Sequence, residues 1–344
     1  MIKELRHIQL HDMMSYLKAV VASLVLCFTI QGCDKEMGEP ESTIDDNSIG
    51  FNAGVEKTRA VVGSISDVQD NGGFSVWGSY TNSDGTLQHV FNGENVYWQT
   101  ASGSTPASWT YDATKYWNQG KTYSFFAVYP YPQNDVYYDN GYKLTFSVPS
   151  NADVDLMTAT ATETATKNSD GEYPTVGFDF AHALSMVNIY IKKNILNEED
   201  VVTVRSVSLG NINLSGTYNS LSGKWENPET ETFSCSNLNV VLPGTPEDAP
   251  TFVLVKGDLM FLPQEITENK VPLTISYTIN SELNKAQGYL PVIVDDEGLT
   301  GWVEQKKYTY NITLGEVKSE ILFNSPVVNN WKNEKPVGGS IIIQ

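Results

Sequence analysis

The amino-acid sequence predicts an all-β protein with two tandem β-sandwich domains and a C-terminal strand tail. The 344 residues are enough for roughly two domains of ~150 residues each. Tyr, Phe and Trp are frequent, and the many Thr, Ser, Asn and Gly residues favour strands and turns. Short apolar runs alternate with Gly, Pro and Asn clusters, which is typical of sandwiches. No sustained 3.6-residue period occurs, so any helix should be short.

Residues 1–32 are predicted to be an export signal. Ala19 to Ile30 is an apolar run preceded by Lys18. A bilayer span needs roughly 20 apolar residues, so this run is too short to cross a membrane but suits the core of a signal peptide. Three methionines are alternative starts of the chain: Met1, Met13 and Met14.

Cys33 is the predicted site of lipidation. Ile30-Gln31-Gly32-Cys33 resembles a bacterial lipobox, in which the cysteine is acylated and becomes the first mature residue. The alternative is an ordinary signal peptide with a chance cysteine near its cleavage site. Asp34-Lys35-Glu36 also resembles the Lys-acidic tag that directs lipoproteins of the Bacteroidetes to the outer surface. The polar, acidic stretch that follows, up to Ser48, is typical of a disordered tether.

Residues 33–59 contain this tether, a first strand and a short basic sequence. The strand has one apolar face, because apolar side chains alternate with Gly, Asn and Glu. The residues of that face are Ile49, Phe51, Ala53 and Val55. Lys57-Thr58-Arg59 comes directly after the strand, and a trypsin-like protease could cut the chain there.

Two strand-rich regions follow, predicted as an N-terminal domain at 60–174 and a C-terminal domain at 175–314. Asn92-Gly93 is a typical hairpin turn between two apolar stretches. Residues 164–175 lack large aliphatic side chains, which is typical of an inter-domain linker. The tail, 315–344, holds further strand candidates, and one apolar face contains Val337, Gly339, Ile341 and Ile343. Such an exposed terminal strand promotes aggregation unless it has a designated partner.

The sequence motifs typical of most catalytic and cofactor sites are missing from the mature chain. Its two histidines, His89 and His182, lie far apart, and no zinc, phosphate-binding or nucleophile-elbow motif occurs. His182 stands between apolar residues and is predicted to be structural. Cys235 is the only mature cysteine besides Cys33, so an internal disulfide is not expected. We therefore expect no enzyme activity, no cofactor and no metal.

The charge of the chain argues against nucleic acid as a partner. The formal net charge is −19 at pH 7, and phosphate backbones repel such a surface. Two acidic groups, 198–200 and 295–297, could serve as calcium ligands or glycosidase carboxylates. Both lie beside turn signals, where solvated loops are the ordinary interpretation. The aromatic stretch from Trp98 to Trp117 could line a sugar-binding face or fill a sandwich core.

The mature chain resembles the fimbrillins of the Bacteroidales, the subunits of type V pili. The resemblance runs along its whole length and rests on several stretches in a fixed order: "FSVWGSY", "WTYDATKYW", "YSFFAVYP", "DLMTATA", "FAHALSMVNIYI" and "KKYTYNITL". It implies transthyretin-like β-sandwich domains. It also places the start of the C-terminal domain near Thr175.

The resemblance implies a structural or adhesive pilus subunit. Such proteins are exported as lipoprotein precursors, anchored by lipid in the outer membrane, and cut by an arginine-specific surface protease. Carried over to this chain, the cut follows Arg59, Ala60 becomes the new N-terminus and the strand at 49–55 is displaced. A strand from the tail of a neighbouring subunit, within Ile321 to Gln344, then fills the groove. The partners implied are other pilus subunits in a homo- or heteropolymer, the arginine-specific protease, and the membrane through the lipid anchor before maturation. The implied location is the cell outer membrane for the precursor and the cell-surface fimbrium afterwards.

Two other classes of function remain open from the sequence. A surface carbohydrate-binding lipoprotein would use the aromatic residues from Trp98 to Trp117 as a stacking platform. A glycoside hydrolase would need two carboxylates roughly 5–10 Å apart in a cleft. Within the pilus, the roles of stalk, tip and anchor subunit also remain open.

Overall fold

The computed structural model describes residues 47–55, 64–131, 137–139, 143–194, 199–244, 251–294, 298, 300–315, 321–330, 336–337 and 340–341. Residues 47–344 form one compact unit. Its described part is all-β apart from one short helix, α2 (Ile65–Asp70), so the predicted fold class is confirmed. The division into two tandem sandwiches stays a prediction.

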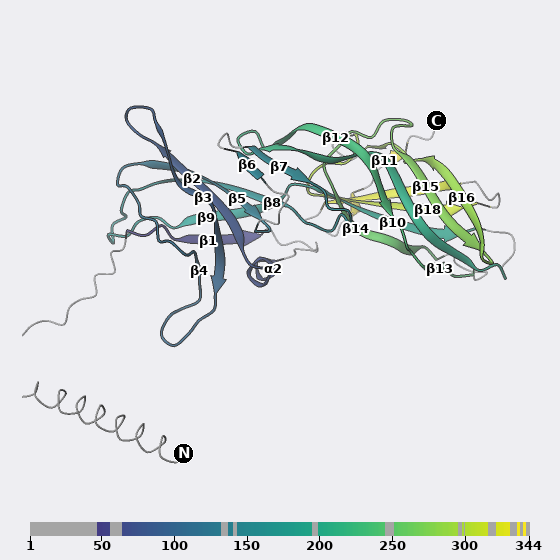
Figure 1. Ribbon diagram of the computed structural model, residues 1–344, viewed down its shortest axis with the longest axis horizontal. Helices are drawn as coiled ribbons and strands as arrows, with labels where there is room; N and C mark the ends of the chain where they lie inside the picture. The colour runs from purple at the N-terminus through teal and green to yellow at the C-terminus, as the bar shows by residue number, and fades with distance from the viewer. Residues whose placement is uncertain are drawn as a thin grey trace, which may run out of the picture. The chain divides into compact units, whose positions relative to one another are not determined.

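The first sheet has seven strands in the order β1-β9-β8-β5-β2-β3-β4 (Figure 1). Their bounds are β1 (Phe51–Val55), β2 (Phe74–Thr81), β3 (Leu87–Gln99), β4 (Ser108–Thr110), β5 (Thr122–Tyr129), β8 (Met157–Thr164) and β9 (Val176–His182). Neighbours are antiparallel except β1 and β9, which are parallel. A bridge between Ser48 and Tyr116 joins the start of β1 to the segment after β4, so the two ends of the sheet meet.

A core of aromatic and aliphatic side chains fills this curled sheet. The strands alternate in the way that the sequence predicts, because every second residue faces the core. Buried members from three strands are Phe74 and Val76 of β2, Phe125 and Ala127 of β5, and Phe178 and Phe180 of β9. Phe51 of β1 and Trp109 of β4 belong to the same core, which therefore joins the two end strands of the sheet order.

Two further sheets pack face to face. The second has the order β14 (Val253–Phe261), β10 (Ser185–Lys193), β18 (Lys306–Leu314), β19 (Ile321–Asn330), β20 (Pro336–Val337). The third has the order β16 (Glu282–Tyr289), β15 (Pro272–Ile279), β11 (Val202–Asn219), β7 (Lys143–Ser147), β6 (Tyr137–Asp139), and β11 also pairs with β12 (Lys224–Cys235) and β13 (Val240–Leu242). A fourth, two-stranded sheet joins β17 (Ile293–Val294) to β21 (Ser340–Ile341).

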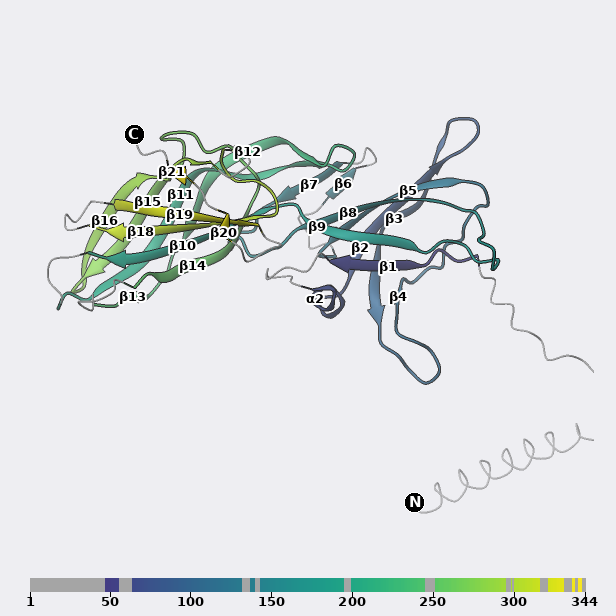
Figure 2. The same cartoon turned by 180° about the vertical axis from the view of Figure 1, so that it is seen from behind.

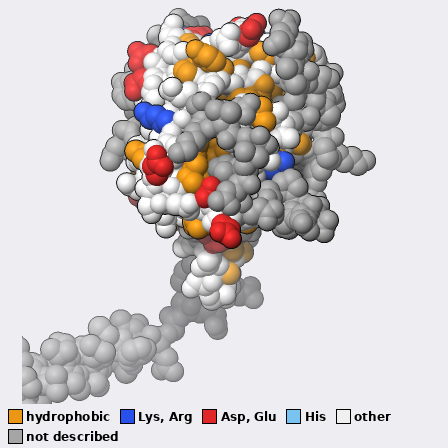
Figure 3. Space-filling model, turned by 90° about the vertical axis from the view of Figure 1, so that its right-hand side faces the viewer, with side chains coloured by type: hydrophobic (Ala, Val, Ile, Leu, Met, Phe, Trp, Pro, Cys, Tyr) orange, Lys and Arg blue, Asp and Glu red, His pale blue; other side chains and the backbone are white. Residues whose placement is uncertain are grey.

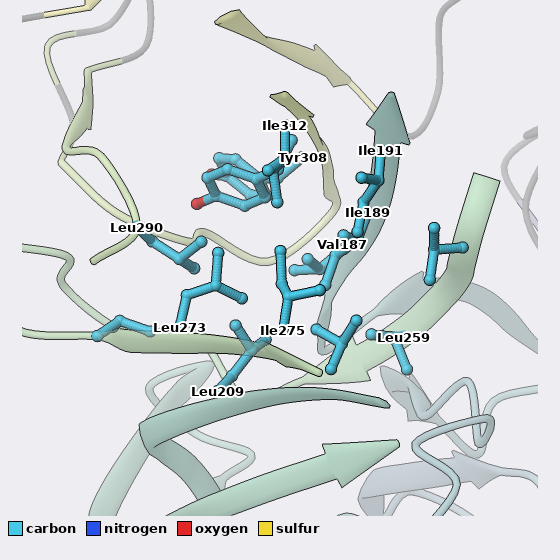
Figure 4. Packing of buried hydrophobic residues seen from close by; sticks show 14 of the residues in the cluster. Val187, Ile189, Ile191, Leu209, Leu259, Leu273, Ile275, Leu290, Tyr308 and Ile312 are labelled. Carbon is cyan, nitrogen blue, oxygen red and sulfur yellow. The ribbon is translucent and has the colours of Figure 1, made fainter. Parts of the chain in front are cut away.

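The core between the second and third sheets is aliphatic with a few aromatic rings. Val187 and Ile189 of β10 point toward Leu273 and Ile275 of β15 (Figure 4). Outside this core, acidic side chains stand at several separate points of the face drawn in Figure 3, among hydrophobic and uncharged ones. That distribution agrees with the acidic composition of the chain.

A smaller apolar cluster connects the first sheet to the other two. It contains Phe126 of β5, Phe146 of β7 and Met260 of β14. Trp225 donates a hydrogen bond from Nε1 to the carbonyl of Ala183 at 2.8 Å. The junction is therefore packed and hydrogen-bonded rather than open.

The chain moves between sheets at points that differ from the sequence prediction. Residues 164–175 connect β8 to β9, and these strands are neighbours in the first sheet, with Met157 opposite His182. The chain enters the second sheet only at Ser185. A polar segment without aliphatic residues has the same composition inside a domain as between domains, so the pattern could not distinguish the two.

Asn92-Gly93 is a bulge within β3, and the predicted turn is wrong. Val76 pairs with Glu94 and Trp77 pairs with Asn92, which leaves Gly93 as an extra residue. Gly93 has a φ of +86°, a conformation that favours glycine. Hairpin turns and this type of bulge both need a residue with positive φ, so the Asn-Gly pattern is compatible with either.

Candidate functional site

β1 is held between two different parts of the first sheet. On one side its residues pair in parallel with β9, Phe51 opposite Val176 and Val55 opposite Phe180. On the other side the residues just before β1 pair with the segment after β4. Figures 1 and 2 show β1 alongside β9 from both directions.

Backbone hydrogen bonds fix both sides of this segment. The Ile49 N–H donates to the Lys115 carbonyl at 2.9 Å, and the Trp117 N–H donates to the Asn47 carbonyl at 2.8 Å. The Val176 N–H donates to the Gly50 carbonyl at 2.9 Å. The segment therefore closes the sheet by hydrogen bonding to both of its ends.

The predicted apolar face of β1 points into the core. Ile49 is 1% exposed and Phe51 is 7% exposed, whereas the side chain of Asn52 faces solvent. Ala53 and Val55 are partly buried and pack against the same core. Because the period is two, one face carries all the apolar contacts of the strand.

Phe51 occupies a pocket made of four aromatic rings. Its ring centroid lies 5.2 Å from that of Phe91, 5.6 Å from Tyr111, 6.2 Å from Phe125 and 5.8 Å from Phe178. The first three contacts are edge-to-face and the last is stacked, which are favourable geometries for aromatic pairs. We call these four residues the ring pocket.

Tyr111 connects the ring pocket to the backbone of the same segment. Its hydroxyl donates to the Ile49 carbonyl at 2.8 Å and accepts from the Lys115 N–H at 3.2 Å. Burial raises the pKa of Tyr111, although the hydrogen bond with the Lys115 backbone acts in the opposite direction. The hydroxyl therefore stays protonated, and available as a donor, over the physiological pH range.

The surface that β1 covers is a groove suited to an extended strand. We call it the β1 seat: the ring pocket together with Lys115, Trp117 and β9. Without residues 47–55, the Lys115 carbonyl and the Trp117 and Val176 N–H groups would lose their partners, and the ring pocket would face water. Both changes are unfavourable, so an empty seat would favour binding of another strand.

Several predicted site residues lie outside the described residues. These are Cys33, Arg59, Ala60, Gly339 and Ile343. The predicted cut falls between two described elements, because β1 ends at Val55 and α2 begins at Ile65 with Ser64 as its N-cap.

The other two residues of the candidate donor strand lie in different sheets. Val337 belongs to β20 and pairs with Val328 of β19. Ile341 belongs to β21 and pairs with Ile293 of β17. In this arrangement the two residues therefore belong to separate short ladders.

The three tryptophans from Trp98 to Trp117 contribute to a core rather than to an exposed platform, and Tyr116 is the one large aromatic side chain of this stretch that is exposed. Trp109 and Trp117 are buried, and Trp98 is partly buried with its ring edge-to-face with that of Trp109 at 5.3 Å. A sugar-stacking surface needs exposed rings in a row. The carbohydrate-binding interpretation therefore loses the feature that motivated it.

His182 and Cys235 have structural explanations. His182 is buried, and its Nδ1 lies 2.8 Å from Oδ1 of Asp155, as expected for a structural histidine. Cys235 is a free, half-buried cysteine, and burial raises the pKa of its thiol. The acidic residues 295–297 lie outside the described residues. In the described part of the chain, no three His, Cys, Asp or Glu residues are grouped to hold a metal ion.

Among the residues that the structure describes, no helix has the length and apolar character needed to cross a bilayer.

Comparison with known proteins identifies a family and a fold. A model of the fimbrillin-like family matches residues 58–331. No curated protein sequence matches. A candidate cell adhesion protein from Bacteroides ovatus has a similar structure, with a TM-score of 0.51 and 14% identity over 84% of this chain and 99% of that one. At this identity the likeness concerns the fold alone.

Two weaker structural matches come from related bacteria. A candidate cell adhesion protein from Bacteroides uniformis has 22% identity and a TM-score of 0.47, covering 83% of this chain and 98% of that one. A fimbrial assembly protein from Parabacteroides distasonis has 12% identity and a TM-score of 0.38, covering 86% of this chain and 99% of that one.

Proposed function

The chain belongs to the fimbrillin-like family, and we propose that it is a structural, adhesive subunit of a cell-surface pilus that assembles by strand exchange. The observation that carries the proposal is the seating of β1, which closes the first sheet and lies only a few residues before the short basic sequence. In this view β1 is a temporary occupant of its seat. The described chain would then correspond to two transthyretin-like sandwich domains and a tail.

Export as a lipoprotein is the first step of the proposal. Residues 1–32 act as the signal, and Cys33 carries the lipid that anchors the precursor in the outer membrane. The acidic tether that follows places the folded chain at the cell surface. The supporting features are the apolar run from Ala19 to Ile30 and the lipobox that ends it.

Cleavage after Arg59 is the second step. An arginine-specific surface protease separates residues up to Arg59 from the rest, leaving Ala60 as the new N-terminus. β1 is then attached only by its contacts with the seat. Fully burying Ile49 and Phe51 contributes about 1.5–3 kcal/mol each, so β1 remains exchangeable rather than permanently bound.

Occupation of the empty seat by a neighbour is the third step. The donor comes from the tail of another subunit, within Ile321 to Gln344, where the face of Val337, Gly339, Ile341 and Ile343 is one candidate. The donor restores the backbone pairing with β9 and covers the ring pocket. Because the tail of one subunit fills the seat of the next, the contact does not close and the product is a filament.

The substitution Arg59→Ala tests the proposal against other functions. The unlipidated precursor, beginning at residue 34, is treated with an arginine-specific protease. The variant should keep its first strand and stay monomeric, whereas the parent chain should polymerise. Lys57→Ala is the matched control, since it removes a neighbouring positive charge but leaves the arginine. Filaments formed by uncut Arg59→Ala would refute cleavage-dependent assembly.

A further inference from the structure

The apolar pattern of residues 49–55 recurs at the start of β19. Residues 49–55 read Ile-Gly-Phe-Asn-Ala-Gly-Val, and residues 321–327 read Ile-Leu-Phe-Asn-Ser-Pro-Val. In both, the alternate positions that share one face are Ile, Phe, a small residue and Val. An Asn follows the Phe in both. The face of β1 that enters the seat is therefore present a second time in the tail.

Building on the proposed function, we infer that residues 321–327 of a second copy of this chain occupy the β1 seat in the register of residues 49–55. Phe323 takes the place of Phe51 in the ring pocket, and Ile321 takes the place of Ile49. The subunit is thus complementary to itself. The tail segment that donates is the one that repeats β1, rather than the end of the chain.

The ring pocket selects among the segments of the tail. An aliphatic residue at the position of Phe51 would leave part of the pocket unfilled, which is unfavourable. The face of Val337, Gly339, Ile341 and Ile343 contains no aromatic residue. Phe323 and Trp331 are the aromatic residues between Ile321 and Gln344.

Trp331 has the wrong neighbours for the seat. The residues two positions away from it in the sequence are Asn329 and Asn333, which would share its face in a strand. The corresponding neighbours of Phe51 are Ile49 and Ala53, which contact the core. Phe323 has Ile321 and Ser325 at those positions and fits the pattern.

The outward face of the seat also accepts the tail sequence. Leu322 would replace Gly50, where an added Cβ meets only Thr175 at 3.9 Å, an ordinary contact. Pro326 would replace Gly54, where an added Cβ lies 3.2 Å from Oδ1 of Asp179. That atom is the end of an exposed side chain, which can move. Proline has no N–H to donate, and its position near the end of the strand limits the loss to one donor.

Ile321 and Phe323 are less buried in β19 than their counterparts are in the seat. Both are partly buried, whereas Ile49 and Phe51 are buried. β19 pairs with β18 from Ile321 onward, and the described residues of β20 pair with Val328 and Asn329. Within the described part of the chain, residues 321–327 are therefore paired along one edge, and transfer to the seat increases the burial of Ile321 and Phe323.

Peptide binding to the cleaved chain tests the choice of segment. The unlipidated chain is cut after Arg59, freed of its N-terminal fragment and titrated with labelled peptides covering residues 47–56, 321–330 and 336–344. We expect the first two to bind the cleaved chain, and neither to bind the uncut chain. Phe323→Ala in the second peptide should weaken binding at least about tenfold, and Leu322→Ala by less than about twofold.

The outcomes separate the inference from the proposed function. Binding of residues 47–56 without binding of residues 321–330 would overturn the inference alone. The inference would also be overturned if the peptide of residues 336–344 bound more tightly than that of residues 321–330, or if the Phe323→Ala peptide bound as tightly as its parent. If the fragment never leaves and no peptide binds, the strand-exchange function fails as well.

Disulfide formation between subunits tests the register. Asn52 lies opposite Gly177 in the β1 seat, so Asn324 of a second copy should lie there after exchange. In a Cys235→Ser background, Gly177→Cys with Asn324→Cys should give disulfide-linked multimers after cleavage, because facing Cα atoms lie within bonding range. Gly177→Cys with Ser340→Cys is the matched control. Multimers from the control pair, or filaments without any crosslink from the Asn324→Cys pair, would overturn the inference.

Discussion

Replacing Phe51 with alanine in the uncut chain should destabilise the first sheet substantially. Phe51 is 7% exposed and contacts the four rings of the ring pocket. Truncating a buried Phe to Ala costs about 3–5 kcal/mol of unfolding free energy, since the surroundings only partly fill the cavity. The pocket rings belong to different parts of the sheet, which limits their ability to collapse.

Urea unfolding of the unlipidated chain measures this loss. Tryptophan fluorescence is a suitable probe, because Trp109 and Trp117 lie in the same core as Phe51. With an m-value of about 1–3 kcal/mol/M, the midpoint should fall by about 1 M or more. The matched control is Asn52→Ala, whose side chain is exposed and which should change stability by less than about 0.5 kcal/mol. A loss below about 1 kcal/mol for Phe51→Ala would refute the importance of the ring pocket.

Three further results are expected. Burial raises the pKa of Tyr111, so the stabilising hydrogen bond from its hydroxyl to the Ile49 carbonyl is fully present below the ordinary pKa of 10.0 and is lost as pH rises through the folded-state pKa. The cleaved chain should therefore release its N-terminal fragment faster above pH 10, as measured by size-exclusion chromatography. Tyr111→Phe should flatten that pH dependence. Burial likewise raises the pKa of the Cys235 thiol, so iodoacetamide should modify Cys235 in the folded chain more slowly at pH 8 than it modifies the cysteine of a short unstructured peptide. Mass spectrometry measures both rates, and equal rates would contradict this. Gly93→Ala should cost about 1–2 kcal/mol in urea unfolding, because its φ is +86° and Trp77 lies 3.2 Å from the added Cβ, whereas Gly177→Ala, with open space around its Cβ, should be nearly neutral.

The parts of the fold that depend on local alternation could be predicted from the sequence. A period of two places Ile49 and Phe51 on one face, and both are buried. The all-β class likewise follows from composition and frequent turn signals. These features depend on neighbouring residues, which the sequence states directly.

The pairing of distant strands could not be read in the same way. Nothing in the sequence of β9 indicates that it joins the first sheet beside β1, because its partners lie far away along the chain. The bulge at Gly93 has the same local signature as a turn. The sequence does not decide whether Trp109 and Trp117 are buried, since aromatic alternation is shared by cores and by stacking surfaces. In each case tertiary packing decides between patterns that are locally equivalent.

The most direct test of the account combines cleavage and assembly in one sample. The unlipidated precursor is treated with a trace of arginine-specific protease while mass and particle size are followed together. The account predicts loss of the segment that ends at Arg59, followed by growth of filaments or multimer ladders. A complete cut after Arg59 that leaves only stable monomers would contradict strand exchange between copies of this chain.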